Sequence, residues 1–266
     1  MNTRILSILF FMQWINGPLW SADPPPIQEI KDEPVVYLGT EESDKRWHHG
    51  GFRSAVGVHK IQTYRATRNQ PLDGDNVGWT YNHAPMLAYW EGRFWMNYVS
   101  NRVEEHGTPG KTGFASSVDG YHWEPPTVGF PVVTLPEIKP QPRYFGGREL
   151  PVIPEGSESV MHQRMGFYVA PNGMLLTSGS YSYCPNVRFG PNRGQGLGRV
   201  VREVYPDGEL GPIYFIRYNR HAGWNEGNTP FPFYKTTDNS DLLEACEALL
   251  ADKRMTLQWW EDDRGD

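Results

Sequence analysis

The chain has 266 residues, of which 38% are hydrophobic and 14% aromatic, and its formal net charge is −6 at pH 7. A chain of this length can bury one large core, and all-β domains often reach this size as single units. The sequence contains no run of basic residues, which argues against a nucleic-acid or anionic-membrane partner. The 28 glycines and 23 prolines, with few helical patterns before residue 238, favour short strands joined by turns.

The first 22 residues have the pattern of a signal peptide. Arg4 precedes the apolar stretch 5–15, and the small residues Ser21 and Ala22 offer a cleavage point. A membrane anchor would need roughly 20 apolar residues, and polar residues interrupt this stretch sooner. Residues 23–34 form a Pro-rich linker in this interpretation. We therefore expect a secreted or periplasmic protein with no membrane span after signal removal.

An internal repeat occupies the middle of the chain. In each copy two strands flank a tight turn, a longer loop leads to a third strand, and an Asp-Gly turn leads toward a fourth. Glycine after Asn or Asp supplies the positive φ that such turns need. A four-stranded antiparallel meander that repeats about an axis forms a β-propeller. The expected strands are 84–90, 93–100, 111–117 and a fourth near Trp123, then 164–169, 174–180, 198–204 and 213–216.

The predicted fold is thus all-β, with propeller blades over residues 35–237. Residues 238–266 supply a short C-terminal helix over 241–251, with Asp238 as its N-cap, and an acidic tail that could begin a truncated further blade. At roughly 40 to 50 residues per blade, the chain accommodates about 4 to 5 blades. Cys184 and Cys246 could pair in an oxidising compartment or stay as buried thiols, and the sequence leaves both open.

Two histidines stand at the same place in the repeat. His83 and His162 each precede an apolar run that turns on a glycine. The first strand of a propeller blade lines the central channel, so a residue at its entrance points into the mouth where ligands bind. The alternative is that each histidine caps a strand through hydrogen bonds. Polar neighbours add further donors at these positions: Tyr81, Asn82, Gln163 and Arg164.

Two other polar clusters are candidates for function. The first contains Trp47, His48, His49 and Arg53 around a Gly-Gly pair, which indicates a loop where both histidines could approach a ligand or where one is structural. The second, residues 101–106, carries Arg102, two glutamates and His106, which suits either a metal site or, the interpretation we favour, a solvated loop.

Five segments carry a family likeness: GWTYNHAPMLAYW, EHGTPGKT, SVDGYHW, MHQRMGFYVAPNG and GLGRVVREVYPDGELGPIYFIRYN. They resemble the secreted bacterial propellers that remove L-rhamnose capping D-glucuronic acid on arabinogalactan side chains, a family of α-L-rhamnosidases and rhamnose-glucuronate lyases. NHAP is more distantly similar to propeller ulvan lyases. SVDGYHW also resembles a shortened aspartate box of sialidase-like propellers, which is structural. The resemblance implies seven blades, more than this chain can hold.

The same resemblance implies a hydrolytic histidine on the opposite face of the propeller. The pair His48 and His49 is the part of this sequence that matches, with His48 favoured. Ordinary glycosidases instead place two carboxylates across the scissile bond. A lyase would use His83 or Tyr81 as the base while Arg164 or a metal neutralises the uronate carboxylate. Further carboxylate partners are Arg53, Arg102 and Arg199, since guanidinium binds carboxylate through two parallel hydrogen bonds.

The expected function is cleavage of a terminal rhamnose-glucuronate linkage in an acidic, plant-type glycan by histidine-based hydrolysis. Elimination at the uronate is the alternative, and a non-catalytic glycan-binding or truncated inactive propeller is a third. Hydrolysis requires no cofactor, whereas a divalent cation could serve a lyase. Gln163, Tyr81 and Asn82 are expected to contact substrate in any of these schemes.

Overall fold

The computed structural model describes residues 61, 63–64, 66, 79–105, 107–138, 144–145, 148–149, 151–184, 190, 195–257 and 259. The expected signal peptide and linker lie outside these residues. So do Trp47, His48, His49 and Arg53, while the side chains of Gln163 and Arg164 lie outside what is described. Among the helices that the structure describes, none combines the length and apolarity needed to cross a membrane.

The first repeat folds as the predicted four-stranded antiparallel meander, with strand order β1-β2-β3-β4. A tight turn at Glu91 and Gly92, both with positive φ, joins the first two strands. The fourth strand is shorter than expected and begins after Trp123, which lies in the preceding turn. The strands are β1 (Tyr81–Trp90), β2 (Arg93–Asn101), β3 (Gly110–Ser117) and β4 (Thr127–Val128).

The second repeat forms a matching sheet with strand order β12-β11-β10-β9. Its first hairpin turns through Pro171, Asn172 and Gly173, and Gly173 has the positive φ that the sequence predicts there. The strands are β9 (Val160–Val169), β10 (Leu175–Ser182), β11 (Gly196–Val204) and β12 (Tyr214–Tyr218). The two repeats are therefore two propeller blades, which confirms the predicted fold class.

The connection between the blades carries structure that the repeat did not predict. Two short ribbons lie in it: β5 (Thr134–Leu135) pairs with β8 (Ser157–Glu158), and β6 (Tyr144–Phe145) pairs with β7 (Arg148–Glu149). Apolar residues of this connection join the core of the second blade, because its strands alone leave that end of the sheet uncovered. The cluster includes Phe130, Leu135, Ile153, Met161, Tyr181 and Phe215.

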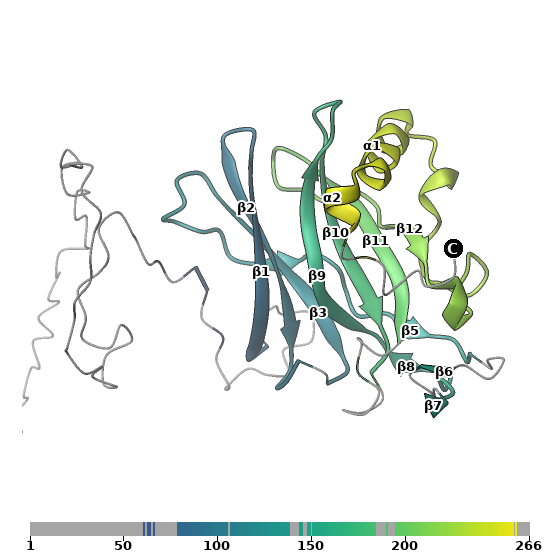
Figure 1. Ribbon diagram of the computed structural model, residues 1–266. Helices are drawn as coiled ribbons and strands as arrows, with labels where there is room; N and C mark the ends of the chain where they lie inside the picture. The colour runs from purple at the N-terminus through teal and green to yellow at the C-terminus, as the bar shows by residue number, and fades with distance from the viewer. Residues whose placement is uncertain are drawn as a thin grey trace, which may run out of the picture. The chain divides into compact units, whose positions relative to one another are not determined.

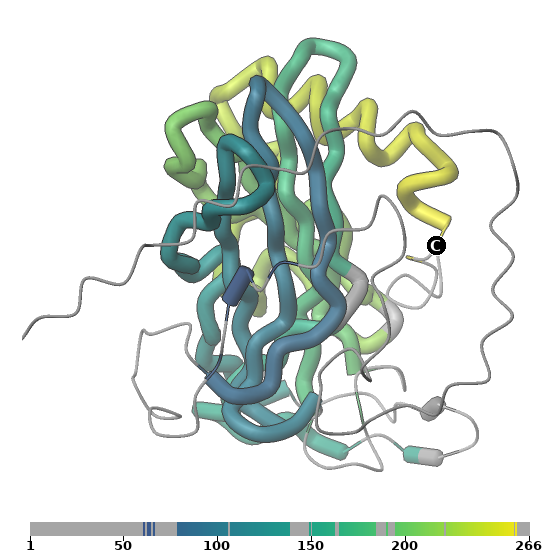
Figure 2. Tube along the Cα trace, turned by 90° about the vertical axis from the view of Figure 1, so that its left-hand side faces the viewer, coloured from purple at the N-terminus to yellow at the C-terminus, as the bar shows by residue number. Residues whose placement is uncertain are grey.

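The two blades pack face to face, and the helix forms a third layer (Figure 1). Trp95 and Phe114 of the first blade contact Leu175 and Val204 of the second in one buried cluster. The indole of Trp90 also donates a hydrogen bond of 2.9 Å to the Gly173 carbonyl, which ties the two hairpin turns together. Figure 2 shows the first blade in front of the second, with their long strands upright.

Helix α1 (Ser240–Ala251) covers the face of the second blade that is turned away from the first. The predicted helix is confirmed, but its N-cap is Asn239 rather than Asp238, because the side-chain Oδ1 of Asn239 accepts the N–H groups of Asp241 and Leu242. The apolar stripe of α1 packs on Leu176, Val201 and Ile216. Short helices flank it: η3 (Arg220–Ala222), η4 (Tyr234–Thr236) and α2 (Lys253–Thr256).

Cys184 and Cys246 are both buried and form no disulfide, so the pairing that the sequence left open is not made. Cys246 belongs to the apolar stripe of α1, and Cys184 follows the end of β10. Each cysteine thus serves as a small apolar side chain in the core.

The aspartate-box turn after β3 is structural, as expected. The Asp119 carboxylate accepts the backbone N–H groups of Tyr121 and His122 at 2.7 and 2.8 Å, and the His122 ring at 2.7 Å. The Ser117 hydroxyl accepts the N–H of Gly120 at 2.8 Å. These contacts satisfy the donors of a tight connection that has no strand partner of its own.

Candidate functional site

His83 and His162 occupy equivalent places in the two blades. Each precedes the residue that closes its first hairpin, Trp90 or Val169, by the same number of residues. A register irregularity follows each histidine along its strand. The sequence repeat is therefore a true structural repeat at this position.

The two histidines nevertheless lie on opposite sides of the second blade. His83 pairs with Val99, which shares a face of β2 with Asn97, and Asn97 bonds to Thr177 of the second blade. The His83 side chain is therefore on the face toward the second blade. His162 pairs with Ser180, whose face of β10 is covered by α1. The two imidazoles do not share one cleft between the blades.

His83 belongs to a partly exposed cluster at the entrance of the first blade, formed with Tyr81 and Glu105. We call these three residues the entrance cluster. The His83 Nε2 lies 3.9 Å from the Glu105 carboxylate, and their side chains are 45% and 27% exposed. The Tyr81 hydroxyl donates a hydrogen bond of 3.5 Å to the same carboxylate. The Tyr81 and His83 ring centroids are 5.8 Å apart.

Burial, and then the neighbouring Glu105 carboxylate, raise the pKa of Tyr81 above its ordinary value. At neutral pH the phenol therefore stays protonated and acts as a hydrogen-bond donor. Of the two bases that the sequence suggested for a lyase, Tyr81 is the poorer one, and His83 is the better proton acceptor.

Two cations lie over a single indole ring at the same end of the first blade. The Lys111 ammonium is 4.3 Å from the Trp79 ring centroid, and the Arg102 guanidinium carbon is 5.6 Å from it. Lys111 and Trp79 are both buried, whereas Arg102 is exposed. Cation–π contacts of this kind stabilise a charge that has lost part of its water. Lys111 is in register with Ser100, so it lies on the face of the first blade that Asn82 and Tyr98 share, opposite to the face of His83 and Tyr81.

His162 and Arg199, two further candidates from the sequence, lie on the second blade. His162 is 4% exposed. It pairs with Ser180 on the next strand, Ser180 pairs with Arg199, and Arg199 pairs with Arg217, so these four residues form a row across the second blade. Trp259 covers the row, with its ring centroid 5.1 Å from the guanidinium carbon of Arg199 and 5.8 Å from that of Arg217. Arg199 is fully buried in this layer. A substrate would therefore reach it only if Trp259 moved.

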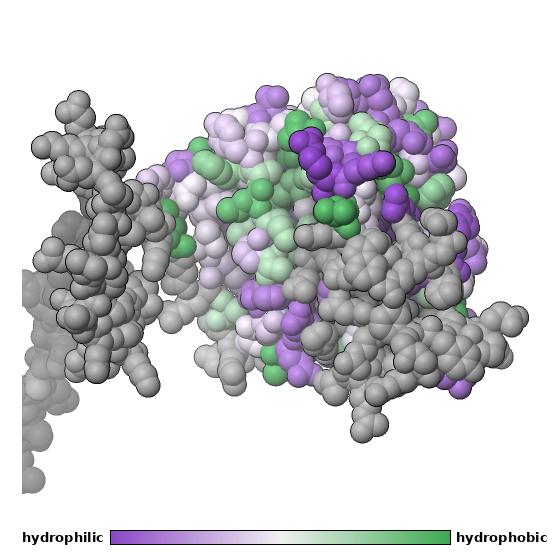
Figure 3. All heavy atoms as spheres, viewed as in Figure 1, coloured by the Kyte–Doolittle hydropathy of each residue, from purple (hydrophilic) through white to green (hydrophobic). Residues whose placement is uncertain are grey.

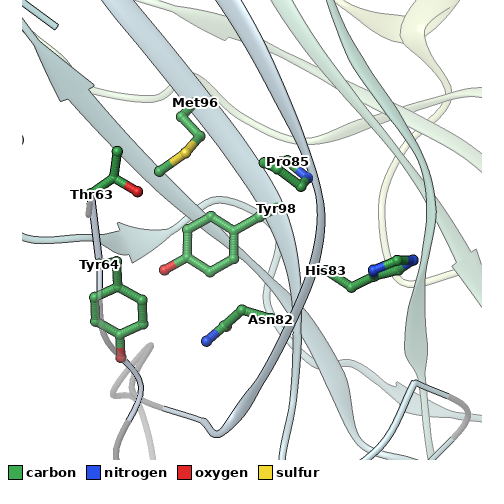
Figure 4. A pocket seen from close by; sticks show the side chains of 7 residues that line it. All are labelled: Thr63, Tyr64, Asn82, His83, Pro85, Met96 and Tyr98. Carbon is green, nitrogen blue, oxygen red and sulfur yellow. The ribbon is translucent and has the colours of Figure 1, made fainter. Parts of the chain in front are cut away.

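Asn82 points to the opposite side of β1 from His83 and lines a pocket of about 150 Å³ (Figure 4). Its amide donates a hydrogen bond of 3.1 Å to the Trp79 carbonyl. The pocket walls include Tyr64, Tyr98 and Met96. Successive residues of a strand face opposite sides, so Asn82 and His83 serve two separate environments.

Sequence reasoning missed part of this arrangement. Glu105 was assigned to a solvated loop, and Trp79 and Lys111 were not singled out. A lysine in the middle of an otherwise small and apolar strand was the available signal, because a buried lysine needs a partner. Among the residues that the structure describes, no group of three or more histidine, cysteine, aspartate or glutamate side chains could hold a metal ion.

Four-stranded antiparallel meanders packed face to face are the blades of a β-propeller. The chain belongs to the BT_1020-like, N-terminal beta propeller family, whose model matches residues 33–266. This family assignment and the observed sheets agree.

A solved structure named "Sialidase" is 40% identical to this chain, with a TM-score of 0.71. The match covers 88% of this chain and 21% of that one, so the chain spans about a fifth of that protein. It confirms the expected sialidase-like propeller, while the rhamnosidase likeness stays a prediction. No curated protein matches the chain.

Two further solved structures share weaker likeness. Zg3597, a family 117 glycoside hydrolase from the marine bacterium Zobellia galactanivorans, is 14% identical over 57% of this chain and 41% of its own, with a TM-score of 0.33. The GH43 β-1,3-galactosidase BT3683 is 17% identical over 68% and 48%, with a TM-score of 0.28. At these values they carry no argument about function.

Proposed function

We propose that this propeller is a carbohydrate-active enzyme of the glycoside hydrolase type, and that it cleaves the terminal L-rhamnose-α-1,4-D-glucuronate linkage of an acidic, arabinogalactan-type glycan. The name of the 40% identical relative, a sialidase, supports the broad class. The exposed guanidinium of Arg102, which follows β2 at the end of the blade where the entrance cluster lies, supports an acidic sugar. The sequence resemblance supports the rhamnose-glucuronate linkage.

The observation that carries the proposal is the His83–Glu105 pair, with Tyr81 bonded to the same carboxylate. At 3.9 Å, imidazole and carboxylate are closer together than two groups that flank a scissile bond, which stand roughly 5 to 9.5 Å apart. The pair therefore acts as one unit. Glu105 holds the imidazole, and His83 exchanges the proton, which imidazole does readily between pH 5 and 8.

In hydrolysis, water adds to the anomeric carbon as the bond to the leaving oxygen breaks. His83 supplies the proton that the leaving oxygen takes up and recovers one from the attacking water, so the site returns to its starting state. His48, with His49 beside it, is the competing candidate that the resemblance supports. The Arg102 guanidinium neutralises the uronate carboxylate while this happens.

Elimination at the uronate is a second candidate, which the Tyr81–His83 pair favours. Neutral His83 would take the proton beside the carboxylate, and the protonated Tyr81 phenol would give its proton to the departing oxygen. The Tyr81 and His83 ring centroids are 5.8 Å apart, so one substrate can contact both the proton acceptor, His83, and the proton donor, Tyr81. The products then include an unsaturated uronate instead of a free uronic acid.

The experiment incubates the purified full chain with rhamnose-capped arabinogalactan. Release of rhamnose without new ultraviolet absorbance identifies hydrolysis, and release with unsaturated-uronate absorbance identifies elimination. We expect His83→Ala to lower the rate by about 10²- to 10⁴-fold. Glu104→Gln is the matched control for Glu105→Gln and should leave the rate unchanged.

If activity survives His83→Ala but not His48→Ala, the entrance cluster is not the catalytic site. Retention on the glycan without any product would instead identify a binding propeller.

We also propose that the protein is exported, to the periplasm or outside the cell, where such a glycan is met. Cell fractionation and N-terminal sequencing of the mature protein test export.

A further inference from the structure

The pocket beside Tyr98 lies on the face of the first blade that is turned away from the second. Tyr98 is in register with Gly113 of β3, and a side chain on Gly113 would fall 2.1 Å from the Tyr98 Cζ. The missing side chain is what lets the phenol lie flat on the sheet. The seven lining residues are Thr63, Tyr64, Asn82, His83, Pro85, Met96 and Tyr98.

The Tyr98 hydroxyl is a buried polar group with unused hydrogen-bonding capacity. Tyr98 is 3% exposed, and within the described part of the chain no group hydrogen-bonds to its hydroxyl. Figure 4 shows this hydroxyl pointing across the pocket toward Tyr64. Buried polar groups are nearly always paired in folded proteins, so an unpaired one that faces a cavity points to a ligand.

The pocket walls combine flat apolar surfaces with neutral polar groups. The Tyr64 and Tyr98 rings stack with centroids 6.0 Å apart at 28°. Met96 and Pro85 add apolar contact, whereas Asn82, Thr63 and the Tyr98 hydroxyl offer hydrogen bonds. His83 contributes to the lining, but Figure 4 shows its ring turned to the other side of the strand. The described lining therefore contains no carboxylate, ammonium or guanidinium.

The volume limits what can bind. About 150 Å³ is below the roughly 300 to 1,000 Å³ of sites for drug-sized ligands, and it corresponds to about five water molecules. One small ring fits that space, and an oligosaccharide does not. A sugar ring has an apolar face that stacks on aromatic side chains and hydroxyls that pair with amide and phenol groups.

We propose that this pocket is a second glycan-binding subsite, which holds a single neutral sugar residue and is separate from the entrance cluster. The Tyr64 and Tyr98 rings contact the sugar face, and the Tyr98 hydroxyl pairs with one of its hydroxyls. A neutral residue of a glycan is bound here, because no charged side chain is among the described lining residues. Binding at this pocket does not require the entrance cluster to be catalytic.

The test titrates the full chain with methyl α-L-rhamnopyranoside, a neutral sugar ring, and follows it by ligand-observed NMR. Tyr98→Phe removes one hydroxyl and keeps the ring, and we expect it to weaken binding at least tenfold. Tyr89→Phe makes the same change on an exposed ring of β1 and should leave binding unaltered. D-glucuronate should not compete with the rhamnoside for the pocket.

Three results would overturn the proposal: no binding of the rhamnoside, equal binding by Tyr98→Phe and the unmodified chain, or competition by glucuronate. A melting curve of each variant separates binding from folding. Because no group in the described part of the chain bonds to this hydroxyl, Tyr98→Phe should melt no lower than the unmodified chain, and a clearly lower melting temperature would show a structural role. Glu105→Gln impairs the proposed cleavage but leaves this binding intact, because Glu105 is not among the described lining residues, so the two proposals fail independently.

Discussion

The Asn97 side-chain amide donates a hydrogen bond of 2.8 Å to the Thr177 hydroxyl, and both side chains are buried where the two blades meet. Asn97 lies in the middle of β2 and Thr177 near the start of β10, so the bond joins the facing sides of the two sheets. It is a polar contact next to an apolar core, where its loss is costly because water does not replace the missing partner.

Thr177→Val removes this hydroxyl and keeps the shape of the side chain. We expect the free energy of unfolding to fall by about 1 to 3 kcal/mol, because the Asn97 amide loses its best acceptor in a buried place. Urea denaturation with an unchanged m value measures the effect. Thr127→Val is the control, since the Thr127 hydroxyl makes an exposed-strand contact of 3.4 Å. Equal midpoint shifts for both variants would contradict the expectation.

Gly198 is irreplaceable for a steric reason. Its φ is +148°, and a Cβ there would lie 2.2 Å from the Arg217 carbonyl oxygen of the paired strand β12. Gly198→Ala should therefore cost about 3 kcal/mol of unfolding free energy, since backbone must move. Gly156→Ala is the control, because Gly156 also has a positive φ, of +81°, but no atom lies within 4 Å of a Cβ placed there. This substitution should cost about 1 kcal/mol of unfolding free energy. Thermal melts that rank the two variants the other way would refute this account.

The aspartate-box turn should make stability depend on pH. Hydrogen bonds from the His122 ring, then from the backbone N–H groups of His122 and Tyr121, hold the pKa of Asp119 well below its usual range. A carboxylate with a lowered pKa stabilises the fold above its unfolded value, near 3.9, and loses this effect as the pH falls through the folded value.

Asp119→Asn should thus lower the melting temperature at pH 7, and the difference from the unmodified chain should shrink steadily below pH 4. Asp207→Asn changes the corresponding turn of the second blade, where the carboxylate accepts one backbone N–H, from Glu209. Its effect at pH 7 should be smaller. A difference for Asp119→Asn that is the same at pH 3 and pH 7 would rule out the charge as its cause.

Cys246 should be chemically inert in the folded protein. Burial, and secondarily the neighbouring Glu247, raise its pKa to about 12, so almost no thiolate is present at pH 8. Iodoacetamide should leave Cys246 unmodified in buffer and alkylate it completely in urea, as read by peptide mass spectrometry. Fast labelling in buffer would mean that α1 detaches from the second blade.

The blades could be predicted from sequence because their signals are local. Glu91-Gly92, Asn172-Gly173 and Asp207-Gly208 mark the turns, and the apolar runs between them set the strands. The same logic failed for the short ribbons between the blades, whose pairs of residues are too brief to show a period. It also chose Asp238 over Asn239 as the helix cap, because both residue types cap helices and only geometry decides between them.

The candidate site was predicted only in part. The repeat pointed to His83 and its neighbours Tyr81 and Asn82, but not to the opposite sides of β1 that they face. Trp259 covering Arg199 joins residues far apart in the chain, and no local pattern predicts such a contact. Glu105 lies in a loop, and its approach to His83 follows from how the end of the blade closes.

Helix α1 makes the two outer sides of the stacked sheets different, because it covers only one of them. An uncovered apolar sheet face readily binds another sheet. The solvent-facing side of α1 instead presents Asp241, Glu244 and Glu247. Figure 3 shows hydrophilic residues over this part of the surface. While α1 is in place, another sheet therefore cannot pack on Leu176, Val201 and Ile216, and acidic side chains meet the solvent there instead.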